Sequence, residues 1–327
     1  MRPARRGTSQ YLGANGGIRS MGDTTLSGLI AAPFTPMGGD GAINPDIIEP
    51  MARLLARNGV SGAFVCGTTG ESLSLTEAER MEIAAAWVNA APEGFRVIVH
   101  VGHDSLEVGK RLAHQAEELG AAAIGSMGPC FFKPASVAEL GAYCRELAAE
   151  APSTPFYYYH IPSLTGLSFN MVDLLTSAGD LIPTLAGVKF TAEDLMDFEL
   201  CRALDGGRYN MLFGRDEILL AALALGANGA IGSTYNFAAP LYTRIIQAFD
   251  AGDLDTARSL QRRSMEMIRT IQGSQGSFLA ASKALMAGLG VDCGPARPPL
   301  QNIERTELSG QLLPALRALG YEDFRCR

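Results

Sequence analysis

Short apolar runs alternate regularly with longer amphipathic segments along this sequence, and this alternation limits the folds that the chain can adopt. Short apolar runs are typical of buried strands, and the amphipathic stretches between them are typical of helices. Strands that are apolar throughout and are separated by helices belong to a parallel sheet that is covered on its faces. The runs are, in order, LSGLIAA, GAFVC, RVIVHV, AAIGSM, PFYYYH, LAGVKF, NMLFG and GAIGS.

Eight candidate strands of this kind favour a closed α/β barrel, the (β/α)8 TIM barrel. An open doubly wound sheet is the alternative, but no GxGxxG motif follows the first run, so the usual dinucleotide site of that fold has no support. The intervening segments carry helix signals. Thr76 with Glu79, and Ser136 with Glu139, have the spacing of a capping box.

We expect one catalytic domain with additions at both ends. Residues 1–22 contain arginine and glycine but lack the apolar stretch of a secretory signal, and we expect a disordered tail there. Residues 23–250 are predicted to form the barrel. From roughly Pro240 to Gly320 the pattern is helical only, so residues 251–327 are predicted to form a C-terminal helical extension.

Composition narrows the classes of partner. The net charge of -7 gives no electrostatic case for binding nucleic acid or an anionic membrane surface, and no apolar run approaches the ~20 residues of a membrane span. The six cysteines contain no CxxC pair and the four histidines are scattered, which indicates neither a disulfide framework nor a metal site. We therefore expect a cytoplasmic protein with reduced thiols that binds a small metabolite and no metal.

Polar side chains occur at four strand ends. The active site of a barrel of this type is built from the carboxyl ends of the strands and the loops that follow them. The motif GTTGES follows the second predicted strand, Tyr159 is near the end of the fifth, Lys189 is near the end of the sixth, and GRDE follows the seventh. These groups are therefore predicted to share one rim.

Lys189 has two interpretations. Lysine is rarely buried unless its charge is paired, so it can end a strand and extend into solvent. Alternatively, a desolvated amine with a lowered pKa can attack a carbonyl and form a Schiff base. Strand alternation turns Tyr157 and Tyr159 to one face and Tyr158 to the other. Tyr159 is nearest the rim and is the candidate acid or base, whereas His160 is expected to be a hydrogen-bonded structural residue.

The other polar groups at the rim also have structural and functional interpretations. The turn around Thr68 and Thr69 provides hydroxyls and backbone N–H groups of the kind that bind a carboxylate, although glycine and threonine are common in turns of any function. Asp216 and Glu217 begin a predicted helix, where the helix dipole favours acidic residues, and they are also suited to accept hydrogen bonds from a polyhydroxylated substrate.

Over about residues 28–300, the chain resembles the N-acetylneuraminate lyase and dihydrodipicolinate synthase superfamily of Schiff-base aldolases. The resemblance rests on five motifs that occur in this order: GTTGES, YYYHIPSLTG, GVKFT, LFGRDE and GAIGSTYN. The resemblance implies that Lys189 forms a Schiff base with pyruvate or another 2-oxo acid. It implies that Tyr159 transfers protons and that Thr68 and Thr69 hold the substrate carboxylate. It also implies a homotetramer that needs no cofactor. The positions that it assigns to binding of the sugar-derived part of the substrate are Thr191, Gly214, Asp216, Glu217 and Ser233.

The resemblance also indicates a branch of the superfamily. Dihydrodipicolinate synthases have an arginine where this chain has Leu164. The chain is instead similar to the lyases that cleave N-acetylneuraminate to N-acetylmannosamine and pyruvate. This similarity lies in GRDE with GSTYN, and in FFKP followed by YYYHIP. Phe131 and Phe132 occupy the segment where many members have a tyrosine that reaches a neighbouring subunit, and they lack its hydroxyl. Three alternatives remain. The first is a related pyruvate-dependent aldolase or dehydratase acting on a 2-keto-3-deoxy sugar acid, the second is dihydrodipicolinate synthase itself, and the third is a non-catalytic sugar-acid sensor.

Overall fold

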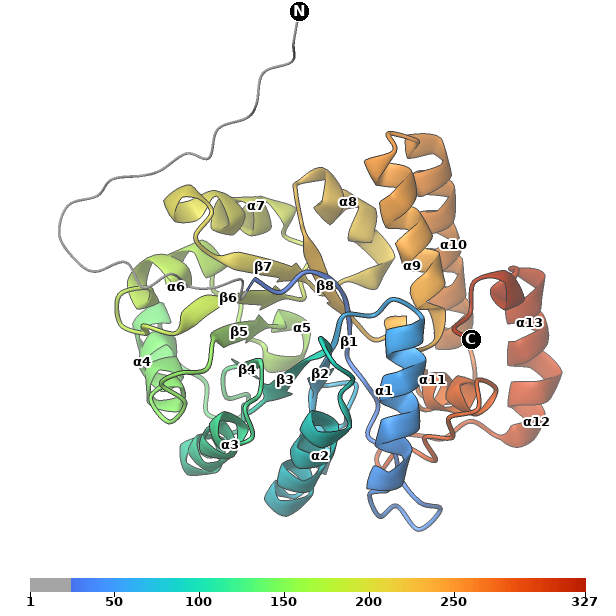
Figure 1. Ribbon diagram of the computed structural model, residues 1–327, viewed down its shortest axis with the longest axis horizontal. Coiled ribbons are helices and arrows are strands. Elements are labelled where there is room, and N and C mark those ends of the chain that lie inside the picture. Colours follow the sequence, from blue (N-terminus) through green and yellow to red (C-terminus); the bar gives the residue numbers. More distant parts are fainter. Residues whose placement is uncertain (1–24) are drawn as a thin grey trace, which may run out of the picture.

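The eight predicted strands form a closed parallel barrel in the computed structural model, which describes residues 25–327 (Figure 1). The predicted tail of residues 1–22 lies outside the described residues. The strands are β1 (Gly28–Ala31), β2 (Gly62–Val65), β3 (Arg96–His100), β4 (Ala123–Ser126), β5 (Phe156–His160), β6 (Leu185–Phe190), β7 (Asn210–Phe213) and β8 (Gly229–Gly232).

The strands neighbour one another in chain order, and β8 closes the sheet by pairing in parallel with β1, with Gly28 opposite Gly229. This topology confirms the barrel and excludes the open sheet. Helices surround the strands (Figure 1). Those of the barrel are α1 (Ile48–Arg57), α2 (Glu77–Ala90), α3 (Leu106–Glu118), α4 (Val137–Ala148), α5 (Pro162–Thr165), α6 (Met171–Ala178), α7 (Leu195–Ala203), α8 (Leu219–Ala224) and α9 (Tyr235–Asp250).

Buried apolar side chains form two layers, one inside the barrel and one between the strands and the helices. Tyr157 and Tyr159 belong to the inner layer and Tyr158 to the outer one, as strand alternation predicts. The inner layer is narrow and is filled by side chains from seven of the eight strands or the residues beside them, and Ala186 of β6 packs against it as a partly buried residue. It consists of Leu26, Ile30, Ala32, Phe64, Ile98, Ala123, Met127, Tyr157, Tyr159, Ile161, Leu212 and Ile231.

The helix signals are largely confirmed. Thr76 and Glu79 form a complete capping box at the start of α2. The Ser136 side chain accepts a hydrogen bond from Glu139 N, but the Glu139 carboxylate accepts from Ala135 N instead of from Ser136 N, so this cap is only half of a box. The helical stretch after β8 begins earlier than the sequence indicates, at the start of α9, because Pro240 lies inside that helix.

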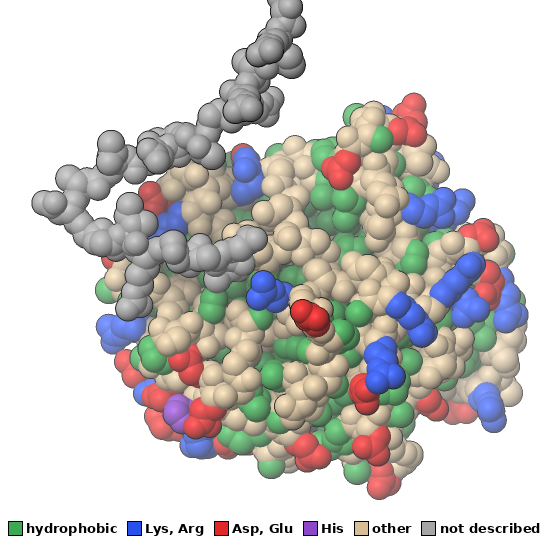
Figure 2. Space-filling model, in the orientation of Figure 1, with side chains coloured by type: hydrophobic (Ala, Val, Ile, Leu, Met, Phe, Trp, Pro, Cys, Tyr) green, Lys and Arg blue, Asp and Glu red, His purple; other side chains and the backbone are tan. Residues whose placement is uncertain are grey.

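The C-terminal helices are α10 (Leu254–Gln272), α11 (Phe278–Ala287), α12 (Arg305–Glu307) and α13 (Leu313–Ala318). At one side of the barrel, α10 and α11 pack against α9, and α12 and α13 lie farther out (Figure 1). The division of the chain into a domain over residues 23–250 and an extension over residues 251–327 stays a prediction. Acidic and basic side chains are scattered over the face in Figure 2, most of them toward its edge, with hydrophobic side chains between them.

Membrane-spanning helices and clustered metal ligands are two features that would indicate particular classes of function. Among the helices of residues 25–327, none is both long and apolar enough to cross a membrane. Within the same residues, histidine, cysteine, aspartate and glutamate form no group of three or more that is able to hold a metal ion. Each of the six cysteines is a free thiol.

Candidate active site

A cavity of about 230 Å³ is lined by residues at and just beyond the carboxyl ends of the strands. It brings together every site residue predicted from the sequence. These residues are Thr68, Thr69, Tyr159, Lys189, Thr191, Gly214, Asp216, Glu217 and Ser233.

Lys189 lies inside the barrel and does not extend into solvent. Its exposed fraction is 4%, so the interpretation as a solvent-directed strand end is wrong. Lys189 and Tyr159 are paired across β5 and β6, and Nζ lies 3.5 Å from the centroid of the Tyr159 ring and 4.5 Å from that of Phe64. Burial lowers the pKa of Lys189, and the nearby Tyr159 and Asp216 oppose this effect without cancelling it.

The Tyr159 hydroxyl lies 3.2 Å from Thr68 Oγ1, so a proton can pass between this tyrosine and the turn after β2. Its ring is fixed by edge-on contacts with Phe64 and His100, at centroid distances of 5.3 and 5.7 Å. These contacts leave the ring little freedom to rotate away from Lys189. The hydroxyl and the amine therefore have a fixed relative geometry.

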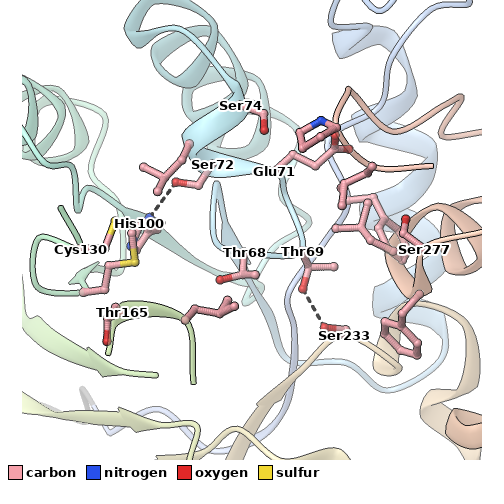
Figure 3. A pocket seen from close by; sticks show the side chains of 18 residues that line it. Thr68, Thr69, Glu71, Ser72, Ser74, His100, Cys130, Thr165, Ser233 and Ser277 are labelled. Atoms are coloured by element: carbon pink, nitrogen blue, oxygen red, sulfur yellow. Dashed lines mark hydrogen bonds between the residues drawn. The ribbon is translucent and has the colours of Figure 1, made fainter. Parts of the chain in front are cut away.

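The turn after β2 presents hydroxyl groups toward the cavity. Thr69 Oγ1 and Ser233 Oγ lie 2.7 Å apart, which links this turn to the end of β8 (Figure 3). The turn closes on itself through a hydrogen bond from Glu71 N to Thr68 O at 3.0 Å. Hydroxyl groups in such a turn are suited to bind an anion such as a carboxylate.

Thr191 and Gly214 form another part of the cavity wall. Thr191 Oγ1 is buried and has no hydrogen-bond partner among residues 25–327, so it is available to a bound molecule. A Cβ atom placed on Gly214 would lie 2.0 Å from that oxygen. Only glycine therefore fits at position 214 without displacing Thr191.

Asp216 and Glu217 differ in their surroundings. Asp216 is buried, and its Oδ2 accepts hydrogen bonds from Thr234 N at 2.9 Å and Thr234 Oγ1 at 2.6 Å. Its Oδ1 has no partner among the described residues. Burial raises the pKa of Asp216 to about 6, although the Thr234 hydrogen bonds act in the opposite direction. Glu217 is partly exposed and pairs with Arg215 at 2.9 Å.

The chain matches the model of the Dihydrodipicolinate synthetase family over residues 25–314. It belongs to that family. It is also 41% identical over 303 residues to the N-acetylneuraminate lyase of Rattus norvegicus, a match that covers 91% of this chain and 94% of the relative.

Solved structures of sialic acid aldolases are close neighbours of this family member. The N-acetylneuraminate lyase of Proteus mirabilis superposes with a TM-score of 0.87 at 41% identity, covering 91% of this chain and 99% of that one. A catalytic lysine mutant of the sialic acid aldolase of Ruminococcus gnavus superposes with a TM-score of 0.87 at 26% identity, covering 94% and 99%. These proteins share the whole barrel with this chain.

Several residues in or beside the cavity were not predicted from the sequence. Phe64 packs beneath the Lys189 amine, and its only sequence signal is its position on an inward-facing site of β2. Ile268, Gln272 and Phe278 reach the cavity from α10 and α11, and no motif marks them. His160 is buried against Phe190, but its Nδ1 has no partner among the described residues, so the prediction of a hydrogen-bonded histidine is wrong for this atom.

A second cavity of about 480 Å³ adjoins the first and shares Thr68, Thr69 and Ser233 with it (Figure 3). Its other side is lined by residues that include Leu73, Met127 and Leu164, so its wall is largely apolar. Cys130 belongs to this wall, and the two residues after it in the chain, Phe131 and Phe132, are 75% and 84% exposed, with their rings in edge-on contact at 4.8 Å.

Proposed function

We propose that this protein is an N-acetylneuraminate lyase, a carbon–carbon lyase that reversibly cleaves N-acetylneuraminate to N-acetylmannosamine and pyruvate. The observation that carries the proposal is the buried Lys189 amine, held 3.5 Å from the centre of the Tyr159 ring in a cavity with hydroxyl and carboxylate groups. The names of the relatives described above support the choice of substrate.

The proposed reaction begins with neutral Lys189, which attacks the C2 ketone of the open-chain sugar. Loss of water gives an iminium ion. Cleavage of the C3–C4 bond then moves its electron pair toward the cationic nitrogen, which leaves an enamine instead of an unstabilised carbanion. Protonation at C3 and hydrolysis release pyruvate and restore the amine. No metal or cofactor enters this scheme, because the lysine nitrogen accepts the electrons.

Tyr159 is proposed to accept the proton of the C4 hydroxyl during cleavage, directly or through the substrate carboxylate. Thr68, whose hydroxyl lies 3.2 Å from that of Tyr159, provides the next step for the proton. Because Phe131 and Phe132 carry no hydroxyl, this chain does not use a tyrosine at either position in the relay. Thr68 and Thr69 are proposed to bind the substrate carboxylate.

The sugar-derived part of the substrate is proposed to lie against the opposite wall. Two buried oxygens there, Thr191 Oγ1 and Asp216 Oδ1, lack partners among the described residues and are suited to hydrogen bonds with sugar hydroxyls. Gly214 leaves the space that this approach needs. Glu217 and Ser233 complete the proposed sugar-binding set.

The main alternative is an aldolase or dehydratase of the same superfamily that acts on a 2-keto-3-deoxy sugar acid. It would use Lys189 and Tyr159 in the same way, so only the substrate separates the two. Dihydrodipicolinate synthase is disfavoured by Leu164, an apolar residue where the resemblance implies an arginine. A non-catalytic sugar-acid sensor is disfavoured by the retained Lys189 and Tyr159.

We further propose that the protein is a cytoplasmic homotetramer. The six free thiols support a reducing compartment. Phe131 and Phe132 expose two large apolar rings directly after Cys130, which lines the apolar cavity, and this exposure supports burial of the segment by another copy of the chain. Light scattering of the purified protein tests the assembly, and a monomer at micromolar concentration would contradict it.

The test of the reaction is reductive trapping. The protein is incubated with N-acetylneuraminate or with pyruvate, reduced with borohydride, and analysed by intact mass and peptide mapping, while N-acetylmannosamine is assayed in an unreduced sample. We expect a reduced pyruvyl adduct on Lys189 with both compounds, together with released N-acetylmannosamine. An adduct from pyruvate alone would retain the aldolase chemistry and reject this substrate, and no adduct from either would reject both.

A further inference from the structure

A second buried lysine lies behind the turn that carries Thr68 and Thr69. The side chain of Lys283, in α11, is 0% exposed, and that of Glu71, which it pairs with, is 1% exposed. Lys283 Nζ donates to Glu71 Oε1 at 2.9 Å, Thr35 O at 2.9 Å and Pro295 O at 2.6 Å. An ammonium group has three protons, so this one is fully used within the protein.

The other oxygen of Glu71 is also held by the C-terminal part of the chain. Glu71 Oε2 accepts a hydrogen bond from Arg297 N at 2.7 Å. The Arg297 guanidinium in turn bonds the Glu79 carboxylate and donates to Ser74 O at 2.7 Å. Both carboxylate oxygens of Glu71 are therefore fixed by residues more than two hundred positions away.

Glu71 has a backbone conformation that needs such support. Its φ of 58° lies in the left-handed region, which is costly for a residue with a side chain. The preceding residue is anchored as well, because Thr35 Oγ1 donates to Gly70 O at 2.7 Å. Since Lys283 binds the carbonyl of the same Thr35, the lysine braces the turn from two sides.

We propose that Lys283 and Glu71 are positioning residues whose buried ion pair fixes the turn of residues 67–72, so that the Thr68 and Thr69 hydroxyls meet the substrate carboxylate. Figure 3 shows Glu71 on the same loop as Thr68 and Thr69. A shift of this loop would change the 3.2 Å separation of Thr68 Oγ1 from the Tyr159 hydroxyl and the 2.7 Å separation of Thr69 Oγ1 from Ser233 Oγ. This inference rests on the proposed function.

Stability alone does not account for the pair. Removing two charges from water costs about as much as their attraction returns, and buried ion pairs are often replaceable by apolar residues without loss of stability. Geometric control of the turn does account for it, because the pair joins the site to α11. The C-terminal helices thus contribute to substrate binding through this support as well as through the wall of the cavity.

The test uses the full chain with the substitutions Lys283→Met, Glu71→Gln and both together. Lys110→Met is the matched control, since it makes the same replacement at a surface lysine paired with Glu146. The fraction of protein reduced by borohydride is measured against pyruvate concentration. In the variants at residues 71 and 283, we expect the pyruvate concentration at half-saturation to rise about ten- to a hundredfold, the effect of a weakened charge-assisted hydrogen bond. Labelling of Lys189 should still be nearly complete at saturating pyruvate.

The double variant matters because it leaves no lone buried charge, so we expect it to stay folded even if a single substitution unfolds the protein. Hydrogen exchange of the peptide spanning residues 66–75 gives a readout independent of activity, and we expect faster exchange there than in Lys110→Met. A folded double variant with wild-type half-saturation and wild-type exchange would overturn the inference. Absence of a pyruvate adduct in the wild type would instead overturn the proposed function, and hydrogen exchange would then decide alone whether the pair holds the turn.

Discussion

Lys189 Nζ lies 3.5 Å from the centroid of the Tyr159 ring, and the two residues face each other across neighbouring strands of the barrel. An aromatic face attracts an ammonium ion and favours the charged amine. Burial acts in the opposite direction and has the larger effect, so the pKa of Lys189 is lowered. The packing that makes the amine reactive therefore also destabilises the folded protein when Lys189 is protonated.

Replacing Lys189 with methionine is expected to abolish turnover and adduct formation while raising the melting temperature at pH 7. The unfolded chain binds a proton at this lysine up to its ordinary pKa of 10.5, whereas the folded chain releases it at lower pH. Wild-type stability should therefore rise with pH between the lowered pKa and 10.5, and the advantage of the variant should shrink across that window. Thermal unfolding at a series of pH values measures this difference.

Two outcomes would contradict this account of Lys189. Substantial turnover in pure Lys189→Met would remove the residue from the reaction. An equal effect of pH on the stability of the wild type and the variant would mean that the amine has its ordinary pKa. Lys110→Met again serves as the control, because its ammonium is at the surface and bound to Glu146.

Tyr159→Phe is expected to slow cleavage by about 10²-fold or more, the usual effect of losing a general acid or base. Tyr157→Phe is the matched control. Tyr157 also faces the interior from β5, but its hydroxyl donates to Asn210 Oδ1 at the other end of the strands. Its loss should cost about 1 kcal/mol of stability and leave the rate unchanged. Single-turnover rates with N-acetylneuraminate make the comparison, and equal rates for Tyr159→Phe and wild type would move the proton transfer to another group.

The barrel and most of its rim were predictable because both depend on local sequence patterns. Apolar runs define the strands, and a polar residue at the end of such a run lies at the rim whatever the rest of the chain does. Lys189 and Tyr159 were found in this way. Their proximity followed from the fold, since β5 and β6 are consecutive strands of a parallel barrel.

The contribution of the C-terminal helices was not predictable by the same means. Amphipathic periodicity identifies α10 and α11 but does not say where they dock, so the approach of Phe278 to the cavity left no signal. The Glu71–Lys283 pair joins residues 212 positions apart. In the sequence, Glu71 belongs to a turn motif and Lys283 resembles any charged residue of a helix, because burial of an ion pair depends on tertiary packing.

Gly214→Ala tests the space beside Thr191. The new Cβ atom would lie 2.0 Å from Thr191 Oγ1 and 3.1 Å from Thr191 Cα, so the threonine must move. We expect a loss of about 1–3 kcal/mol in stability from overpacking, and a rise of roughly tenfold in KM for N-acetylneuraminate, as for a lost binding hydrogen bond. Gly39→Ala is the control, since a Cβ there meets nothing within 4 Å. An unchanged KM in a stable Gly214→Ala variant would exclude Thr191 from substrate binding.

Asp216 should give substrate binding and stability a shared dependence on pH. Its pKa is raised by burial from 3.8 to about 6, so between these values the folded state holds a proton that the unfolded state has released. The raised pKa of Asp216 therefore adds up to about 3 kcal/mol to the free energy of unfolding below pH 4, and this contribution is lost as the pH rises through 6. Asp216→Asn does not titrate, and denaturant unfolding from pH 4 to 7 should show the wild type losing stability relative to it.

If the ionised carboxylate accepts hydrogen bonds from the sugar, KM for N-acetylneuraminate in the wild type should rise below pH 6, while the variant keeps a high KM without that inflection. Parallel pH profiles for the two proteins would mean that Asp216 is already ionised at low pH or does not contact the substrate, and the stability measurement separates these two outcomes.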